Sequence, residues 1–144
     1  MTALFEEVTE ASIRRQVDAF YGQVRRDPTL GPIFSAAIAE DGWPAHLEKM
    51  CAFWSSVMLT SGRYKGNPVS AHRKVAGIAP PMFATWLDLF EATASALFVP
   101  DIAEQFACKA RRIAESLKLA LFFRPDQGWP EDLRRRPRVA TPCA

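Results

Sequence analysis

Four side chains with polar tips stand out in the sequence, because each lies on an otherwise apolar helical stripe. They are Tyr21, His46, His72 and Trp86, and the chain has only two histidines. A buried polar group without a partner costs about 1–3 kcal/mol, so four such groups on separate helices indicate a shared pocket whose ligand uses them. A helical bundle with a large aromatic core is the alternative, since the chain holds 10 phenylalanines and 4 tryptophans.

The segment from Tyr64 to Val75 reads as a Gly-Asn-Pro turn that leads into a short helix. Asn67 is placed to cap this helix, and Pro68 to occupy its first position, where the missing N–H of proline costs nothing. His72 follows one turn later, between two long helical stretches. We predict that His72 and His46 face each other across a buried flat cofactor, with His72 on its metal.

The residues near these two histidines in the helical pattern exclude several kinds of metal site. No Asp or Glu shares their inward faces, whereas zinc and di-iron sites need three or more protein ligands or carboxylates. The three cysteines have no paired ligand spacing, and the sequence has no His-Glu-x-x-His, Gly-x-Gly-x-x-Gly or Gly-x-x-x-x-Gly-Lys-Ser/Thr motif. A single imidazole is enough for haem, because the porphyrin supplies other ligands and apolar walls supply much of the affinity.

Apolar residues recur at helical spacing along most of the chain, and no useful stretch alternates as a strand does. The predicted long helices are Thr9 or Ser12 to about Arg26, Trp43 to about Thr60, about Met82 to Phe98, and a last one capped by Asp101 and ending near Phe123. One or two helical turns are expected at Leu30–Phe34, followed by a connector at 36–42. The sequence therefore predicts an all-α domain over residues 1–124.

Composition and charge fit one globular domain. Of the 144 residues, 49% are hydrophobic and 24% are charged, with a formal net charge of +2. Positive charge is in excess only at the end of the chain, so no nucleic-acid surface is expected. No apolar run reaches the ~20 residues of a membrane span, and no signal-peptide pattern opens the chain, so we expect a cytoplasmic protein without membrane contact. Residues 125–144, rich in Pro and Arg, are expected to form a mobile tail.

A set of motifs is spread over about residues 10–123: Phe20-Tyr21, Asp27-Pro28-x-Leu30-Gly31-Pro32-Ile33-Phe34, Trp43-x-x-His46, Phe53-Trp54, Tyr64-x-Gly66-x-Pro68-x-x-x-His72 and Phe83-x-x-Trp86-Leu87-x-x-Phe90. In combination these motifs resemble the truncated haemoglobins, and more narrowly the third group of that family, also called the P group. The chain also lacks the Gly-Gly hinges of the other two groups.

The resemblance implies a two-over-two helical sandwich around haem b. His72 matches the proximal iron ligand. Tyr21 matches the distal tyrosine, whose hydroxyl donates to bound dioxygen, and Trp86 matches the tryptophan whose indole N–H points at the same ligand. His46 matches a distal histidine that acts as a gate in this group, and whether it points in or out stays open.

The resemblance and the pattern of charge also indicate which residues contact the cofactor. Phe34 matches the ring-packing phenylalanine, and the stretch after His46 continues the pocket wall. The residues expected to bind haem are Phe34, Met50, Phe53, Trp54, Arg63, Tyr64, His72, Arg73, Phe83 and Trp86. After His72 the sequence departs from the family pattern, so the partners of the propionates stay open among Lys49, Arg63, Lys65 and Arg73, by charge only.

Two hydrogen-bond donors beside a bound ligand would hold dioxygen tightly and polarise it. That suits redox turnover, such as nitric oxide dioxygenation or peroxide chemistry, and such turnover needs a separate reductase. The alternative is reversible carriage of oxygen, or sensing of O2, NO or CO, without turnover. A helical interaction module that binds no haem is a third class. We expect a monomer or a weak dimer.

Overall fold

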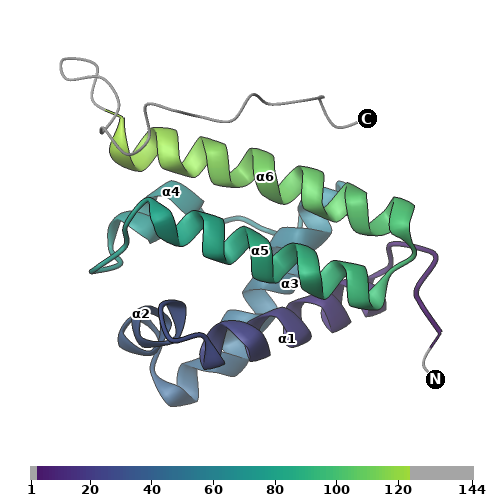
Figure 1. Ribbon diagram of the computed structural model, residues 1–144, viewed down its shortest axis with the longest axis horizontal. Coiled ribbons are helices and arrows are strands. Elements are labelled where there is room, and N and C mark those ends of the chain that lie inside the picture. The colour runs from purple at the N-terminus through teal and green to yellow at the C-terminus, as the bar shows by residue number, and fades with distance from the viewer. Residues whose placement is uncertain (1–2, 124–144) are drawn as a thin grey trace.

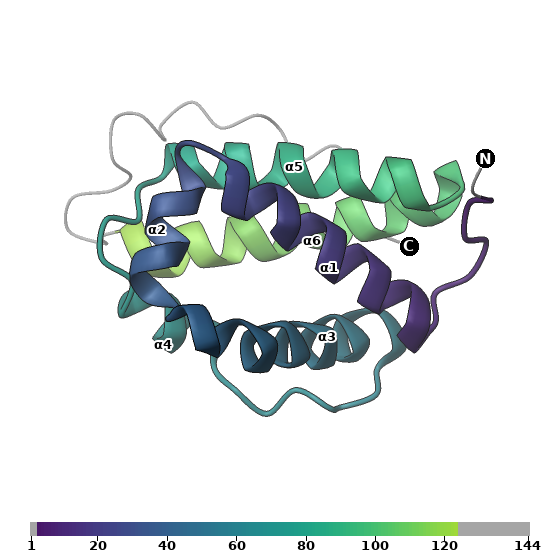
Figure 2. The same ribbon diagram turned by 90° about the horizontal axis from the view of Figure 1, so that it is seen from below.

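The computed structural model describes residues 3–123, and within them it has six α-helices and one turn of 3-10 helix. They are α1 (Glu10–Arg26), α2 (Leu30–Ala37), η1 (Glu40–Gly42), α3 (Trp43–Leu59), α4 (Pro68–Arg73), α5 (Pro81–Leu97) and α6 (Pro100–Phe122). Helices α5 and α6 lie side by side and antiparallel, while α1 and α3 form the other pair, as Figure 1 and Figure 2 show. This is the predicted two-over-two arrangement. The tail predicted at 125–144 lies outside the described residues.

Local hydrogen bonds explain where the first two helices begin. The Thr9 hydroxyl accepts from the Ser12 amide at 3.0 Å, and the Ser12 hydroxyl accepts from the Thr9 amide at 2.8 Å, so the two residues form a reciprocal capping box. Asp27 is extended and ends α1, as expected for a residue before proline. Its carboxylate then accepts from the amides of Thr29 and Leu30, at 2.9 and 2.8 Å, and so starts α2.

Two predicted boundaries are wrong. Asp101 does not cap α6: the helix begins at Pro100, and Val99 is the N-cap. The Val99 carbonyl accepts from the amides three and four residues ahead at 3.1 and 2.9 Å, and proline needs no partner for a missing N–H. The Asp101 carboxylate instead lies in the first turn, where it complements the helix dipole. The connector expected at 36–42 is also shorter, since α2 continues to Ala37 and η1 follows.

A stack of aromatic rings joins the two layers. Phe90 on α5 is fully buried and lies between two indoles, with its ring centroid 4.6 Å from that of Trp54 and 5.4 Å from that of Trp86. Phe20 on α1 meets Phe90 and Trp86 edge-on, at 5.0 and 5.4 Å. Rings in stacked and edge-to-face contact restrain one another's orientation. The stack therefore sets the place of Trp86 and of Tyr21, the residue after Phe20.

Among residues 3–123, no helix has the length and hydropathy that a bilayer crossing requires.

The close approach of α1 and α2 can be tested at Gly31. A Cβ atom at Gly31 would lie 2.8 Å from the Arg25 carbonyl oxygen, and backbone cannot move aside cheaply. We expect Gly31→Ala to lower the free energy of unfolding by about 1–3 kcal/mol in a denaturant titration. Gly22→Ala is the control: its Cβ would meet only the end of the Arg26 side chain, at 3.4 Å, and should stabilise α1 by up to about 1 kcal/mol. Equal effects of the two changes would contradict the assigned contact.

Candidate functional site

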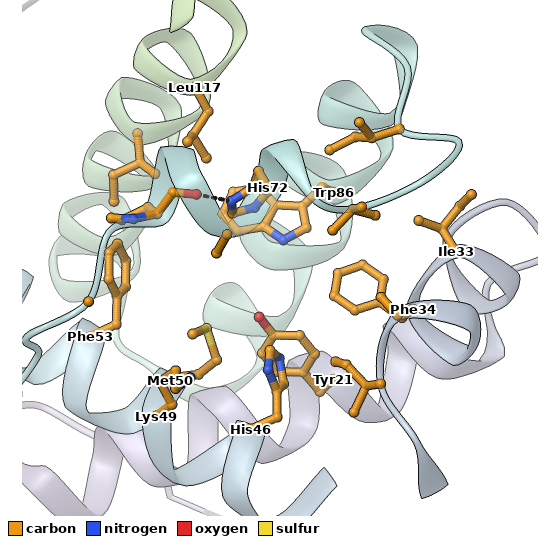
Figure 3. A pocket seen from close by; sticks show the side chains of 18 of the residues that line it. Tyr21, Ile33, Phe34, His46, Lys49, Met50, Phe53, His72, Trp86 and Leu117 are labelled. Carbon is orange, nitrogen blue, oxygen red and sulfur yellow. Dashed lines mark hydrogen bonds between the residues drawn. The ribbon is translucent and has the colours of Figure 1, made fainter. Parts of the chain in front are cut away.

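A cavity of about 390 Å³ lies between the helices, within the size range of small-molecule and cofactor sites. Its lining comes from α1 to α6 and from the segments that join α3 to α4 and α4 to α5. Eleven of the candidate residues line it, namely Tyr21, Phe34, His46, Lys49, Met50, Phe53, Trp54, Tyr64, His72, Phe83 and Trp86. Figure 3 shows that His72 and Trp86 lie on one side of the space, with Tyr21 and His46 on the other.

His72 is presented by α4, a helix of 6 residues. The sequence starts this helix as predicted: the Asn67 side chain accepts from the Ser70 amide at 3.1 Å, and Pro68 occupies the first turn. The His72 Nδ1–H donates to the Pro68 carbonyl at 2.6 Å, a bond drawn dashed in Figure 3. A carbonyl can only accept, so in the neutral imidazole this bond assigns the proton to Nδ1 and leaves the lone pair on Nε2. A histidine held in this way is ready to ligate a metal through Nε2.

Tyr21 supplies a neutral hydroxyl to the opposite side of the cavity. Its side chain is 6% exposed, and burial raises the pKa of the phenol above its ordinary value. The hydroxyl therefore keeps its proton at neutral pH and remains a hydrogen-bond donor. Figure 3 shows it pointing into the cavity, toward the side that holds His72 and Trp86.

His46 points inward, which answers the question that the sequence left open. Its ring meets those of Tyr21 and Trp43 edge-on, with centroids 5.0 and 5.4 Å apart. The Arg25 guanidinium lies 4.5 Å from the centroid of the Trp43 ring and so supports this contact. Nε2 of His46 is buried and has no hydrogen-bond partner in the described part of the chain. Burial, helped by the positive charge of Lys49, lowers the His46 pKa to about 4.

Trp86 comes from α5 and its orientation follows from the aromatic stack. Its indole is nearly parallel to the Phe90 ring, with 9° between their planes, and perpendicular to the Phe20 ring. In Figure 3 the ring nitrogen of Trp86 lies on the edge that faces Tyr21. The indole N–H and the Tyr21 hydroxyl thus converge on the same part of the cavity.

The structure distinguishes between the four basic residues that the sequence offered as partners of the haem propionates. Lys49 lines the cavity and is exposed, so its ammonium group lies at the edge of the space. The other three are not among the lining residues. Arg63 pairs with the Glu10 carboxylate, and Arg73 donates to the Ala120 carbonyl at 3.4 Å. Charge alone could not distinguish these positions.

Several apolar lining residues were not predicted as part of the site. Ile113, Ala114 and Leu117 of α6 complete the wall beside Phe83, and α2 adds Ile33. Leu117 is buried and Ile113 is half-buried, on the apolar face that helical periodicity marks along α6. That pattern marks a buried face, however, and does not say which part of the face packs on the core and which borders a cavity.

The chain is similar to the group 3 truncated hemoglobin of Campylobacter jejuni, with 31% identity over 120 residues, or 82% of this chain and 94% of that protein. The crystal structure of the group III truncated hemoglobin from Campylobacter jejuni superposes with a TM-score of 0.79 at 30% identity, covering 83% of this chain and 96% of the other. The chain belongs to the group III truncated haemoglobins. A search against protein-family models found no match.

This family implies a haem cofactor, and the cavity of this globin fits one. Its walls are largely aromatic and aliphatic, His72 offers Nε2 as a ligand, and half-buried His46 lines the same space with a buried Nε2 that has no hydrogen-bond partner among the described residues. Among residues 3–123, Lys49 is the only lysine or arginine that lines the cavity, and it is at the exposed edge, where charged groups of a cofactor would reach solvent. A bound haem would supply an iron that takes diatomic gases as ligands.

The buried state of His46 predicts an unusual titration. In an unfolded chain His46 takes a proton near pH 6.5, but in the folded protein only near pH 4. The unfolded state then binds more protons between these values, so the free energy of unfolding should rise with pH from about 4 to about 6.5. Nuclear magnetic resonance of the His46 imidazole Cε1–H in the cofactor-free protein would follow the proton directly. His46→Phe should remove this contribution to the slope, and a midpoint near 6.5 would show that the ring is solvated.

Proposed function

We propose that this globin holds haem b with Nε2 of His72 as the single protein ligand of the iron. We propose further that it binds O2, NO or CO on the side of Tyr21 and His46, in the space that the ring nitrogen of Trp86 also faces. The observation that carries the proposal is the bond from His72 Nδ1 to the Pro68 carbonyl, because it leaves Nε2 unprotonated at the cavity. Tyr21 and His46 on the opposite side, and the ring nitrogen of Trp86 that faces Tyr21, then have a ligand to bind.

Hydrogen bonding by the chain's own residues would decide how long a ligand stays. Tyr21 and Trp86 each offer one donor, and each donor would contribute about 1–3 kcal/mol in a site without water. Because 1.4 kcal/mol corresponds to about a tenfold change, the two together would slow ligand release strongly. His46 is neutral at pH 7 and would add either a donor or an acceptor, depending on its tautomer.

Slow release favours redox chemistry on O2, NO or peroxide over delivery of oxygen. We include in the proposal a separate reductase that returns the iron to its ferrous state, a cytoplasmic location, and a monomer or weak dimer. Reversible oxygen carriage or gas sensing is the second candidate. Consumption of nitric oxide by the oxygenated protein, over several turnovers with a chemical reductant, separates the two, since a carrier would release its ligand without consuming it.

Lys49 and Tyr64 are the residues that we assign to the carboxylates of the cofactor. Both line the cavity, and both come from its α3 side, where Tyr64 packs edge-on against Phe53 at 5.2 Å. An ammonium group and a phenol are suitable partners for carboxylates. Arg63 and Arg73 are left out of this assignment because they bond to other parts of the chain.

The assignment of His72 is tested by absorption spectra of the ferric, ferrous and carbon monoxide forms. The wild-type protein should show a Soret band and a five-coordinate ferrous form, and His72→Ala should lose or shift that spectrum. Added imidazole should restore much of it by entering the space left by the side chain. A His72→Ala variant with the wild-type ligand field would contradict the assignment.

The roles of Tyr21 and Trp86 are tested by oxygen dissociation rates. We expect Tyr21→Phe and Trp86→Phe each to speed oxygen release by about tenfold or more, since each change removes one donor and keeps an aromatic ring. Phe53→Leu is the control, because Phe53 lines the same cavity without a polar atom. If stopped-flow measurements show equal oxygen dissociation rates in all three variants, the proposal that Tyr21 and Trp86 donate hydrogen bonds to the ligand is contradicted.

A further inference from the structure

The segment 60–67 joins α3 to α4 without helical structure and returns along α3, as Figure 2 shows. The reversal begins where Thr60 and Gly62 adopt positive φ, at 54° and 71°. Further on, the Tyr64 amide donates to the Ser56 hydroxyl at 2.9 Å. This connecting segment leads directly to Pro68, whose carbonyl holds His72.

A polar cluster of four residues fastens the connecting segment to two helices. Glu10 lies in the first turn of α1, and Ser55 lies on α3 with 0% exposure. The Ser55 hydroxyl donates to one oxygen of the Glu10 carboxylate at 2.6 Å, and it lies 2.7 Å from the Ser61 hydroxyl, from which it can then accept. The Arg63 guanidinium bonds the other Glu10 oxygen. Both carboxylate oxygens are therefore used, one by α3 and one by the connecting segment.

This cluster differs from an ordinary surface ion pair because it includes a buried hydroxyl. An exposed pair of charges in water contributes little by itself. Ser55 is removed from solvent, however, and its bond to Glu10 is charge-assisted, which makes it stronger and costly to leave unmade. Glu10 is thus fixed by Ser55, and Arg63 closes onto a carboxylate that is already in place.

We infer that Glu10 and Arg63 are positioning residues for the cofactor: through the connecting segment they hold Tyr64 and His72 at the cavity. Arg63 is the neighbour of Tyr64, and α4 is too short to be stable alone, so it depends on the chain on either side. The inference rests on the proposed function in one respect, namely that the cofactor held by His72 is haem.

The test is the rate at which holoprotein loses haem to an excess of an acceptor apoglobin. We expect Glu10→Gln and Arg63→Met each to speed the loss by about three- to tenfold, and the double variant to lose haem no faster than the worse single variant, because both changes break one unit. Arg63→Lys should keep most of the wild-type behaviour. Amide hydrogen exchange at Tyr64 should also be faster in Glu10→Gln and Arg63→Met.

Arg14 and Glu48 provide a matched control, because they also pair α1 with α3 at the surface. Their side chains are 45% and 61% exposed, compared with 43% for Arg63 and 51% for Glu10, and they do not touch the connecting segment. Arg14→Met and Glu48→Gln should therefore leave haem loss and Tyr64 exchange unchanged. This separates a positioning role from general loss of stability.

The outcomes distinguish this inference from the proposed function. If the wild-type protein shows no haem spectrum that depends on His72, the proposed function fails. If that spectrum is present, and Glu10→Gln and Arg63→Met lose haem at the wild-type rate or only as fast as Arg14→Met, the inference about the cluster is overturned while the proposed function stands.

Discussion

The burial of Phe90 between Trp54 and Trp86 is the contact on which the rest of the site depends. The two indoles come from different layers, so the stack fixes the distance between α3 and α5. Phe20 adds α1 to the same cluster. Aromatic pairs in such geometry contribute about 0.5–1.5 kcal/mol beyond their buried area, and their orientation is specific. Because this aromatic cluster holds the two layers at a fixed separation, the space beside it can stay open as a cavity whose walls have defined positions.

Much of the fold could be predicted, because it depends on signals that are local in sequence. The 3.6-residue period of apolar side chains located α1, α3, α5 and α6 to within one or two residues, and the turn residues Asn67 and Pro68 located α4. Asp101 shows the limit of such reasoning. Aspartate is a good N-cap residue, so the sequence pointed to Asp101 as the N-cap of α6. The helix instead begins at Pro100, because proline is well suited to the first helical position.

The site was predicted unevenly for a physical reason. Tyr21 and His72 could be found because a polar tip on an apolar stripe must be accounted for inside the protein. Arg63 and Arg73 could not be told from Lys49, since a charge has no periodicity and its partner depends on folding: Glu10 is 53 residues from Arg63 in the chain. The inward position of His46 likewise depends on its contact with Tyr21, which only the packing of α1 against α3 brings about.

Burial gives the side of the cavity that holds Tyr21 and His46 a consistent electrostatic character. It shifts the pKa of Tyr21 upward and that of His46 downward, and both shifts favour the uncharged form. These two side chains are therefore neutral donors and acceptors throughout the physiological pH range, while the cationic Lys49 lies at the exposed edge. A nonpolar diatomic molecule can enter such a space without displacing a counter-ion. Once charge develops on the ligand, neutral dipoles already aimed at it stabilise that charge with little reorganisation.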